Sequence, residues 1–301
     1  MLSRLLQALV LGQSLLAAAL AALLLRAGEP LWAVIGALLI LGFYALVLAL
    51  EFTLLRQAHG QDPAPRASLT QLLSAWWGEV RTVPAVFFWR QAFRGQLWPD
   101  HLLESARGRR GVLLLHGFVC NRGLWNPWLR RLRDQDVPVI ALSLEPLFGS
   151  IDAYRAQIET AVARLEQATG LAPVIVGHSM GGLALRCWWA EQEGEGRVHH
   201  AITMGSPHSG TWLARFALTR NSRQMRQGSV WLRDLQRLEA SRPPGRASRI
   251  TCFYSHCDNI VFPASTATLP GADNRHLAGV AHLQMADQPE PWAELQRRLR
   301  A

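Results

Sequence analysis

The stretch "VIVGHSMGGLALR", residues 174–186, changes from strand formers to helix formers within thirteen positions. Its first three residues are β-branched and apolar, which favours a strand buried on both faces of a parallel sheet. Its last four residues propagate a helix well, and the glycines between permit a sharp turn with close packing. Ser179 stands at the turn, in the G-x-S-x-G pattern of a nucleophile at the positive end of a helix. The alternative is a capping serine in a glycine-rich turn, so the rest of the chain has to decide.

Apolar runs of strand length recur from residue 110 onward, with helical stretches between them. These runs cover 111–117, 137–144, 173–179, 199–206 and 249–255. Helical patterns over 123–134, about 152–168 and 181–193 separate the first four, and Pro291 suits the first position of a final helix. Such alternation predicts an α/β domain over 110–301, with a mostly parallel sheet wrapped by helices.

A nucleophilic serine needs a base and an acid that orients the base. Asp258 follows the strand "RITCFYS", and His282 lies shortly before the final helix, so both are expected on loops beside Ser179. His276 is the competing base, but it is expected to begin a strand "HLAGV". Asp273 is the competing acid, although a polar loop aspartate is the simpler interpretation. His256 is too close to Asp258 to reach the serine from a separate loop.

The oxyanion of an acyl-transfer intermediate needs two backbone N–H donors. Met180, directly after the candidate nucleophile, is predicted to supply one. Phe118, in "HGFVCNRGLW" after the first apolar strand, is predicted to supply the other. The alternative for the "HG" pair is a tight exit from a strand.

The stretches "LLLHGF", "GHSMGGLALR", "MGSPHSGT" and "DNIVFP" stand in the order seen in bacterial lipases and esterases, and residues 110–285 resemble that part of the α/β-hydrolase superfamily. The resemblance implies a Ser179–Asp258–His282 triad and a lid at roughly 209–247. In that lid, Met225, Val230, Trp231, Leu232 and Leu235 would form an apolar helical face. The first two strands usual in the superfamily are not apparent, which implies a reduced sheet or strands within 97–110.

Residues 5–25 and 31–50 carry no charge, and each would form a helix about 30 Å long, enough to cross a bilayer. Because only "RAGEP" separates them, residues 1–56 are predicted to form a transmembrane helical hairpin. The first run could instead be a cleaved signal peptide, but it is longer than the usual apolar region and a second span follows directly. The hairpin is expected to tether the protein and to supply no catalytic group.

Residues 57–109 are predicted to connect the hairpin to the domain. A polar linker over 57–68 precedes a segment in which Trp76, Trp77, Phe87, Phe88, Trp89, Phe93 and Trp98 stand among arginines. Tryptophan with arginine suits a membrane interface. The alternative is that these aromatic side chains cover one face of the following domain.

The formal net charge is +9, and all 31 basic residues are arginine. They are scattered and lack the aromatic interleaving of a single-strand nucleic-acid groove, so a membrane-facing basic surface is expected and no nucleic-acid partner. The two ends of the predicted hairpin carry more positive charge than its turn. Arg4 lies at one end and Arg56 and Arg66 at the other, whereas Glu29 offsets Arg26 in the turn. This bias predicts a multi-pass protein of the bacterial inner membrane with the catalytic domain in the cytoplasm. Free buried cysteines would agree with that compartment.

These features together predict a membrane-anchored serine hydrolase that cleaves carboxylic esters, with acyl lipids or small esters as substrates. The chemistry needs no metal and no organic cofactor. An acyltransferase or a thioesterase would use the same three side chains. A non-catalytic membrane-anchored interaction protein is the alternative from another class.

Overall fold

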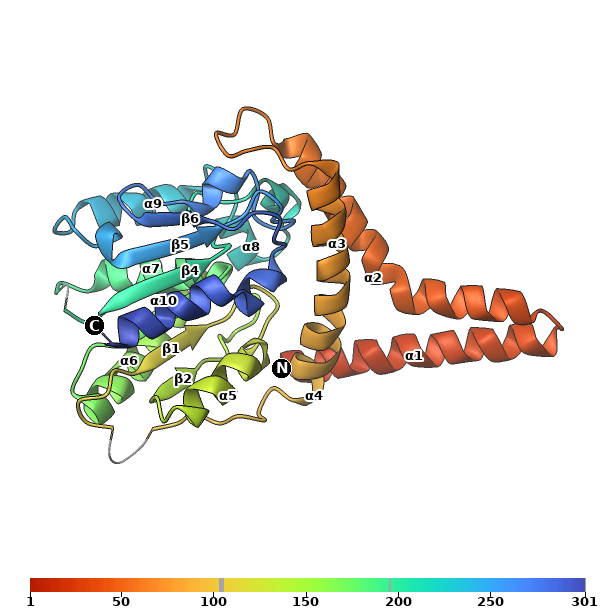
Figure 1. Ribbon diagram of the computed structural model, residues 1–301, viewed down its shortest axis with the longest axis horizontal. Helices are drawn as coiled ribbons and strands as arrows, with labels where there is room; N and C mark the ends of the chain where they lie inside the picture. The colour runs from red at the N-terminus through yellow and green to blue at the C-terminus, as the bar shows by residue number, and fades with distance from the viewer. Residues whose placement is uncertain (103–105, 195, 301) are drawn as a thin grey trace.

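A central parallel sheet forms the body of the protein in the computed structural model, which describes residues 1–102, 106–194 and 196–300 (Figure 1). Its order is β2-β1-β3-β4-β5-β6, and every neighbouring pair is parallel. The strands are β1 (Val112–Leu115), β2 (Val139–Ala141), β3 (Val174–His178), β4 (His200–Met204), β5 (Ile250–Tyr254) and β6 (Asp273–His276). The predicted parallel sheet is therefore confirmed.

Helices cover both faces of the sheet because its central strands are apolar on both sides. Leu113 and Ile175 point into a core shared with α6 (Arg155–Thr169) and α7 (Met180–Glu191). Alternate residues of the same strands pack instead with α5 (Asn126–Asp134) and α10 (Pro289–Arg300). Helix α10 begins at Pro289, two residues before the predicted start, and short 3-10 turns precede α5 and α6 (Arg122–Trp125 and Ile151–Tyr154).

The sheet is reduced at its β2 edge. In the described part of 97–110, the only pairing is one antiparallel bridge between His101 and Val139, with two backbone hydrogen bonds of 2.8 Å. Residues 103–105 of that segment lie outside the described residues. At the other edge, His276 is the last residue of β6, so the expectation that it begins a strand is wrong.

The strand order reverses at β1, which has β2 on one side and β3 on the other. Leu115 at the end of β1 pairs with Gly177 near the end of β3. Loops that leave parallel strands at such a reversal diverge and open a crevice at the carboxyl edge of the sheet. The segments with Phe118 and Ser179 leave the sheet at this point.

Two long apolar helices, α1 (Leu2–Arg26) and α2 (Pro30–Ala58), form a hairpin that projects away from the sheet (Figure 1). Both are long and apolar enough to cross a membrane. Most of their large side chains are exposed, including Leu16, Leu38 and Phe43. Helix α2 continues eight residues beyond the predicted span and brings Phe52 and Leu55 into contact with the domain.

The aromatic segment forms α3 (Leu69–Val83), a π-helical turn η1 (Pro84–Arg90) and α4 (Gln91–Phe93), which cross between the hairpin and the sheet (Figure 1). Some of its aromatic side chains pack inward, and the indole of Trp76 donates a hydrogen bond to the Ala45 carbonyl at 3.0 Å. Others face outward, with Trp77 53% and Trp89 54% exposed. The segment thus covers the domain and also presents aromatic side chains on its outer face.

The segment predicted as a lid, 209–247, contains α8 (Arg220–Gln224) and α9 (Val230–Ala240). Leu232 and Leu235 of α9 are buried in the core beside α7. Glu239 of the same helix forms an ion pair of 2.6 Å with the buried Arg186 of α7. Helix α9 therefore packs on the outside of α7.

Candidate active site

Ser179 occupies a strained turn between β3 and α7. Its φ of 54° and ψ of −127° lie in a backbone region that residues other than glycine rarely adopt. The turn is packed so tightly that a Cβ on Gly181 would lie 2.4 Å from the Leu115 carbonyl oxygen. The Ser179 N–H donates to the Met204 carbonyl at 2.8 Å, which ties the turn to β4. This geometry holds the serine side chain above the carboxyl edge of the sheet.

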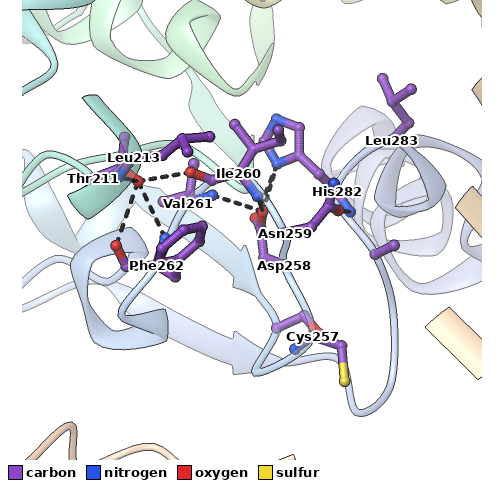
Figure 2. A network of polar contacts seen from close by, with 12 residues as sticks. Thr211, Leu213, Cys257, Asp258, Asn259, Ile260, Val261, Phe262, His282 and Leu283 are labelled. Atoms are coloured by element: carbon purple, nitrogen blue, oxygen red, sulfur yellow. Dashed lines mark hydrogen bonds and ion pairs between the residues drawn. The ribbon is translucent and has the colours of Figure 1, made fainter. Parts of the chain in front are cut away.

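Asp258 and His282 are hydrogen-bonded at 2.9 Å between a carboxylate oxygen and Nδ1 (Figure 2). Asp258 follows β5, and its other contacts are the backbone N–H groups of Ile260 and Val261 at 2.9 and 2.8 Å. Thr211 braces the same loop by donating a hydrogen bond to the Ile260 carbonyl at 2.6 Å. Both members of the pair are buried, so the imidazole is held in one orientation.

Ser179 and His282 line one cavity of about 230 Å³. The carbonyl of His282 lies 3.0 Å from Nε2 of His178, the residue before the serine, and the two rings are 4.7 Å apart. With Nδ1 engaged by Asp258, Nε2 of His282 is the ring nitrogen left to face the cavity. The structure thus brings all three predicted triad residues to one site.

The pKa of His282 is raised above its ordinary value of 6.5. Burial alone would lower the pKa, but the charge of Asp258 and its hydrogen bond favour the imidazolium, and Glu79 adds to the effect. This is the electrostatic environment of a base that has to accept a proton.

The loop after β1 lies against the serine. A Cβ on Gly117 would stand 2.8 Å from the Ser179 Cβ, so a larger residue could not fit there. His116 holds this turn through contacts of 2.8 Å with the Gly117 carbonyl and the Leu144 N–H. Phe118 lines the cavity, and Met180 begins α7 directly after the serine. Both predicted oxyanion donors therefore lie next to Ser179.

The competing residues have other partners. Nε2 of His276 accepts a hydrogen bond from the His256 N–H at 3.4 Å, and the two rings lie 4.6 Å apart. Asp273 forms an ion pair of 2.6 Å with Arg275 at the sheet edge. None of these three side chains, His256, His276 or Asp273, lines the cavity beside Ser179.

The cover of the cavity comes from the N-terminal helices. Leu48 and Glu51 of α2, with Glu79 and Val83 of α3 and Phe87 of η1, line it opposite the sheet. The expectations that residues 209–247 would cover the site and that the hairpin would only tether the protein therefore do not match the structure. Helix α2 lines the cavity both from within the predicted span, through Leu48, and from just beyond it, through Glu51.

Two glutamates in this cover contact the candidate catalytic loops. Glu51 accepts a hydrogen bond of 2.7 Å from Asn259 Nδ2, and Asn259 Oδ1 accepts one of 3.3 Å from the His282 N–H. Glu79 accepts one of 2.9 Å from the Leu283 N–H. Neither glutamate was predicted as a site residue, although each interrupts an apolar or aromatic run, in "LALEF" and "WWGEV".

A parallel sheet with a strained serine in the sharp turn from a strand to a helix is typical of the α/β-hydrolase class of proteins. Residues 112–300 match the family model described as "Alpha/beta hydrolase family", and the chain belongs to this family. No curated protein matches the chain.

Solved structures with the same fold include lipases. The mature lipase BlEst2 of Bacillus licheniformis superposes with a TM-score of 0.56 at 15% identity, over 64% of this chain and 92% of that one. Lipase B of Aspergillus fumigatus gives a TM-score of 0.51 at 19% identity, over 65% of this chain and 53% of that one. At these identities the likeness establishes the shared fold.

Proposed function

We propose that the chain is a membrane-anchored serine hydrolase that cleaves carboxylic esters, including those of acyl lipids. The observation that carries the proposal is the 2.9 Å contact between His282 and Asp258 on a cavity shared with the strained Ser179. The lipase names of the structural neighbours agree with ester substrates.

In the proposed reaction, Ser179 Oγ attacks the ester carbonyl while His282 Nε2 takes its proton. The backbone N–H groups of Phe118 and Met180 donate hydrogen bonds to the developing oxyanion. His282 then protonates the leaving alcohol oxygen as the C–O bond breaks, which leaves an acyl group on Ser179. Water, deprotonated by His282, attacks this acyl-enzyme. The bond between the acyl carbon and Ser179 Oγ then breaks, His282 returns the proton to Oγ, and the carboxylic acid leaves. Asp258 holds the imidazole tautomer and stabilises its charged form throughout.

The decisive experiment combines a covalent probe with turnover. The full chain in detergent should react with a fluorophosphonate probe and hydrolyse a panel of esters of increasing acyl length. Ser179→Ala should abolish labelling and lower turnover by about 10⁴-fold or more, with the fold retained. Undiminished labelling of the alanine variant would remove Ser179 from the mechanism. Release of a new glycerol ester upon addition of glycerol would instead indicate acyl transfer.

The membrane part of the proposal rests on the exposed apolar surface of the hairpin. Exposed apolar helix faces of this length are stable only when lipid or protein covers them. The arginine bias of the sequence favours a cytoplasmic position for both ends of the hairpin. Reporter fusions after residue 60 should behave as cytoplasmic, and fusions at Gly28 as exported. A periplasmic reporter after residue 60, or cleavage near residue 22, would contradict this topology.

A further inference from the structure

Glu79, which lines the cavity beside Ser179, has a carboxylate oxygen that the proposed reaction does not use. Glu79 is only 1% exposed, and its Oε1 accepts the Leu283 N–H at 2.9 Å. Its Oε2 is buried and has no hydrogen-bond partner among the described residues. Buried polar atoms in native proteins are nearly always paired, so an unpaired one in a reaction cavity points to a ligand.

Glu79 lies on the side of the site from which the alcohol leaves. The base that takes the proton of the serine later gives it to the leaving oxygen, so the alcohol part of the ester lies at His282. Leu283, which donates to Glu79, directly follows His282 in the chain. Glu79 and His282 also line the same cavity.

Apart from Glu51, which is hydrogen-bonded to Asn259, the other side chains of the cover around Glu79 are apolar. Leu48, Val83, Phe87 and Leu283 give the cavity an apolar wall around it. Burial raises the pKa of Glu79 to about 7, against which the backbone hydrogen bonds from Leu283 and Gln284 act only in part. A hydrogen-bond donor from a ligand would satisfy the free oxygen and offset its desolvation.

We propose that Glu79 binds a hydrogen-bond donor, a hydroxyl or an ammonium group, in the alcohol part of the substrate. The preferred substrates are then esters whose alcohol keeps a second polar group close to the ester, as partial glycerides and amine-bearing esters do. This inference rests on the proposed function, because it takes Ser179 and His282 as the reacting groups.

Three octanoate esters test this inference on the full chain in detergent. The glycerol monoester carries free hydroxyls, the propyl ester has the same carbon chain without them, and the 2-(dimethylamino)ethyl ester carries one N–H when protonated. The wild-type kcat/KM should be about tenfold higher for at least one donor-bearing ester than for the propyl ester. The two donor-bearing esters separate a hydroxyl subsite from an ammonium subsite. Equal values for all three would overturn the inference and leave the proposed function intact.

Two substitutions locate the donor site. Glu79→Leu should bring the ratio of donor ester to propyl ester close to one. Glu79→Gln keeps an acceptor for the Leu283 N–H but puts an amide donor at the free position, so it should abolish preference for the ammonium ester and keep part of any preference for the hydroxyl ester. Glu290→Gln makes the same change on the exposed start of α10 and should leave the ratios unchanged.

A wild-type ratio in Glu79→Leu would show that the donor binds elsewhere and would overturn the inference. If Glu79→Leu does not fold, the wild-type ratios and Glu79→Gln decide. Absence of both probe labelling and turnover of every ester would overturn the proposed function, and the inference with it.

Discussion

The carboxylate of Glu51 accepts a hydrogen bond from Asn259 at 2.7 Å, although 208 positions separate the two residues in the chain. Asn259 follows the candidate acid Asp258 and also contacts the backbone N–H of His282 at 3.3 Å (Figure 2). The second apolar helix is therefore hydrogen-bonded to the loop that carries the acid and, through Asn259, linked to the base. A movement of α2 would therefore be transmitted through Asn259 to His282.

Loss of the hydrogen bond between Glu51 and Asn259 should lower activity, which would not happen if the hairpin only tethered the protein. We expect Glu51→Leu in the full chain to reduce kcat/KM for a soluble short-chain ester about tenfold, because Asn259 loses its partner and the His282 loop loosens. Steady-state kinetics in detergent measures the effect. Glu29→Gln at the exposed hairpin turn is the matched control. A chain that begins at Gln57 should be impaired at least as much, and full activity in it would show that the hairpin only anchors the protein.

Alanine substitution should distinguish the two candidate bases, His282 and His276. His282→Ala should lower kcat by about 10⁴-fold, because the serine loses its proton acceptor. His276→Ala should retain most of the activity, since its ring packs on His256 at the end of β6. Ester turnover by both variants measures the difference. The reverse pattern would transfer the role of the base to His276.

The loss of activity at acid pH should have its midpoint above 6.5, the ordinary pKa of a histidine. His282 has to be neutral to accept a proton, and its pKa is raised above 6.5. The kcat/KM should therefore rise with pH through a midpoint above 6.5. Asp258→Asn removes the charge that favours the imidazolium, so its midpoint should move to lower pH and its kcat should fall about 10³- to 10⁴-fold. An unmoved midpoint would show that another group controls this limb.

Ionisation of the buried Glu79 should lower the free energy of unfolding at neutral and alkaline pH. Its pKa is raised by burial to about 7 in the folded protein, whereas in the unfolded chain it ionises near 4.5. The cost grows as pH rises from 4.5 through 7 and is complete above 7. Glu79→Gln should therefore stabilise the protein more at pH 8 than at pH 5, with a difference in the free energy of unfolding of up to about 3 kcal/mol. Denaturant unfolding in detergent measures it, and equal effects at both pH values would contradict a buried ionisable Glu79.

The exposed indoles of Trp77 and Trp89 should increase the turnover of membrane substrates and should not affect the turnover of soluble ones. Trp77 and Trp89 face outward beside Arg81 and Arg94, whose guanidinium groups lie 5.9 and 5.1 Å from the rings. Their joint replacement by alanine should weaken turnover of long-chain ester in vesicles severalfold, because two interfacial anchors are lost, and should leave a soluble ester unaffected. Trp76→Ala is the comparison, and it should lower the melting temperature because that indole bonds to Ala45. Unfolding of the double variant would assign the outer indoles to the core.

The sheet and the three candidate catalytic residues could be predicted from the sequence. The β-branched runs predict strands buried on both faces, and the glycines around Ser179 predict a turn that has no room for larger side chains. Asp258 and His282 follow because chain order and strand ends restrict which side chains can meet at one sheet edge. All of this information is local, or depends only on the order of the elements.

Only the tertiary structure shows which segments cover the site. The resemblance implied residues 209–247, yet Leu232 and Leu235 bury that segment against α7. The cover comes instead from α2 and η1 and from α3, which carries Glu79. No local pattern could show this, because a contact such as Glu51 with Asn259 depends on how two distant segments pack against each other. A charged residue at the end of an apolar helix fits equally well with exposure to water and with burial in a catalytic cavity, and only its neighbours in space distinguish the two.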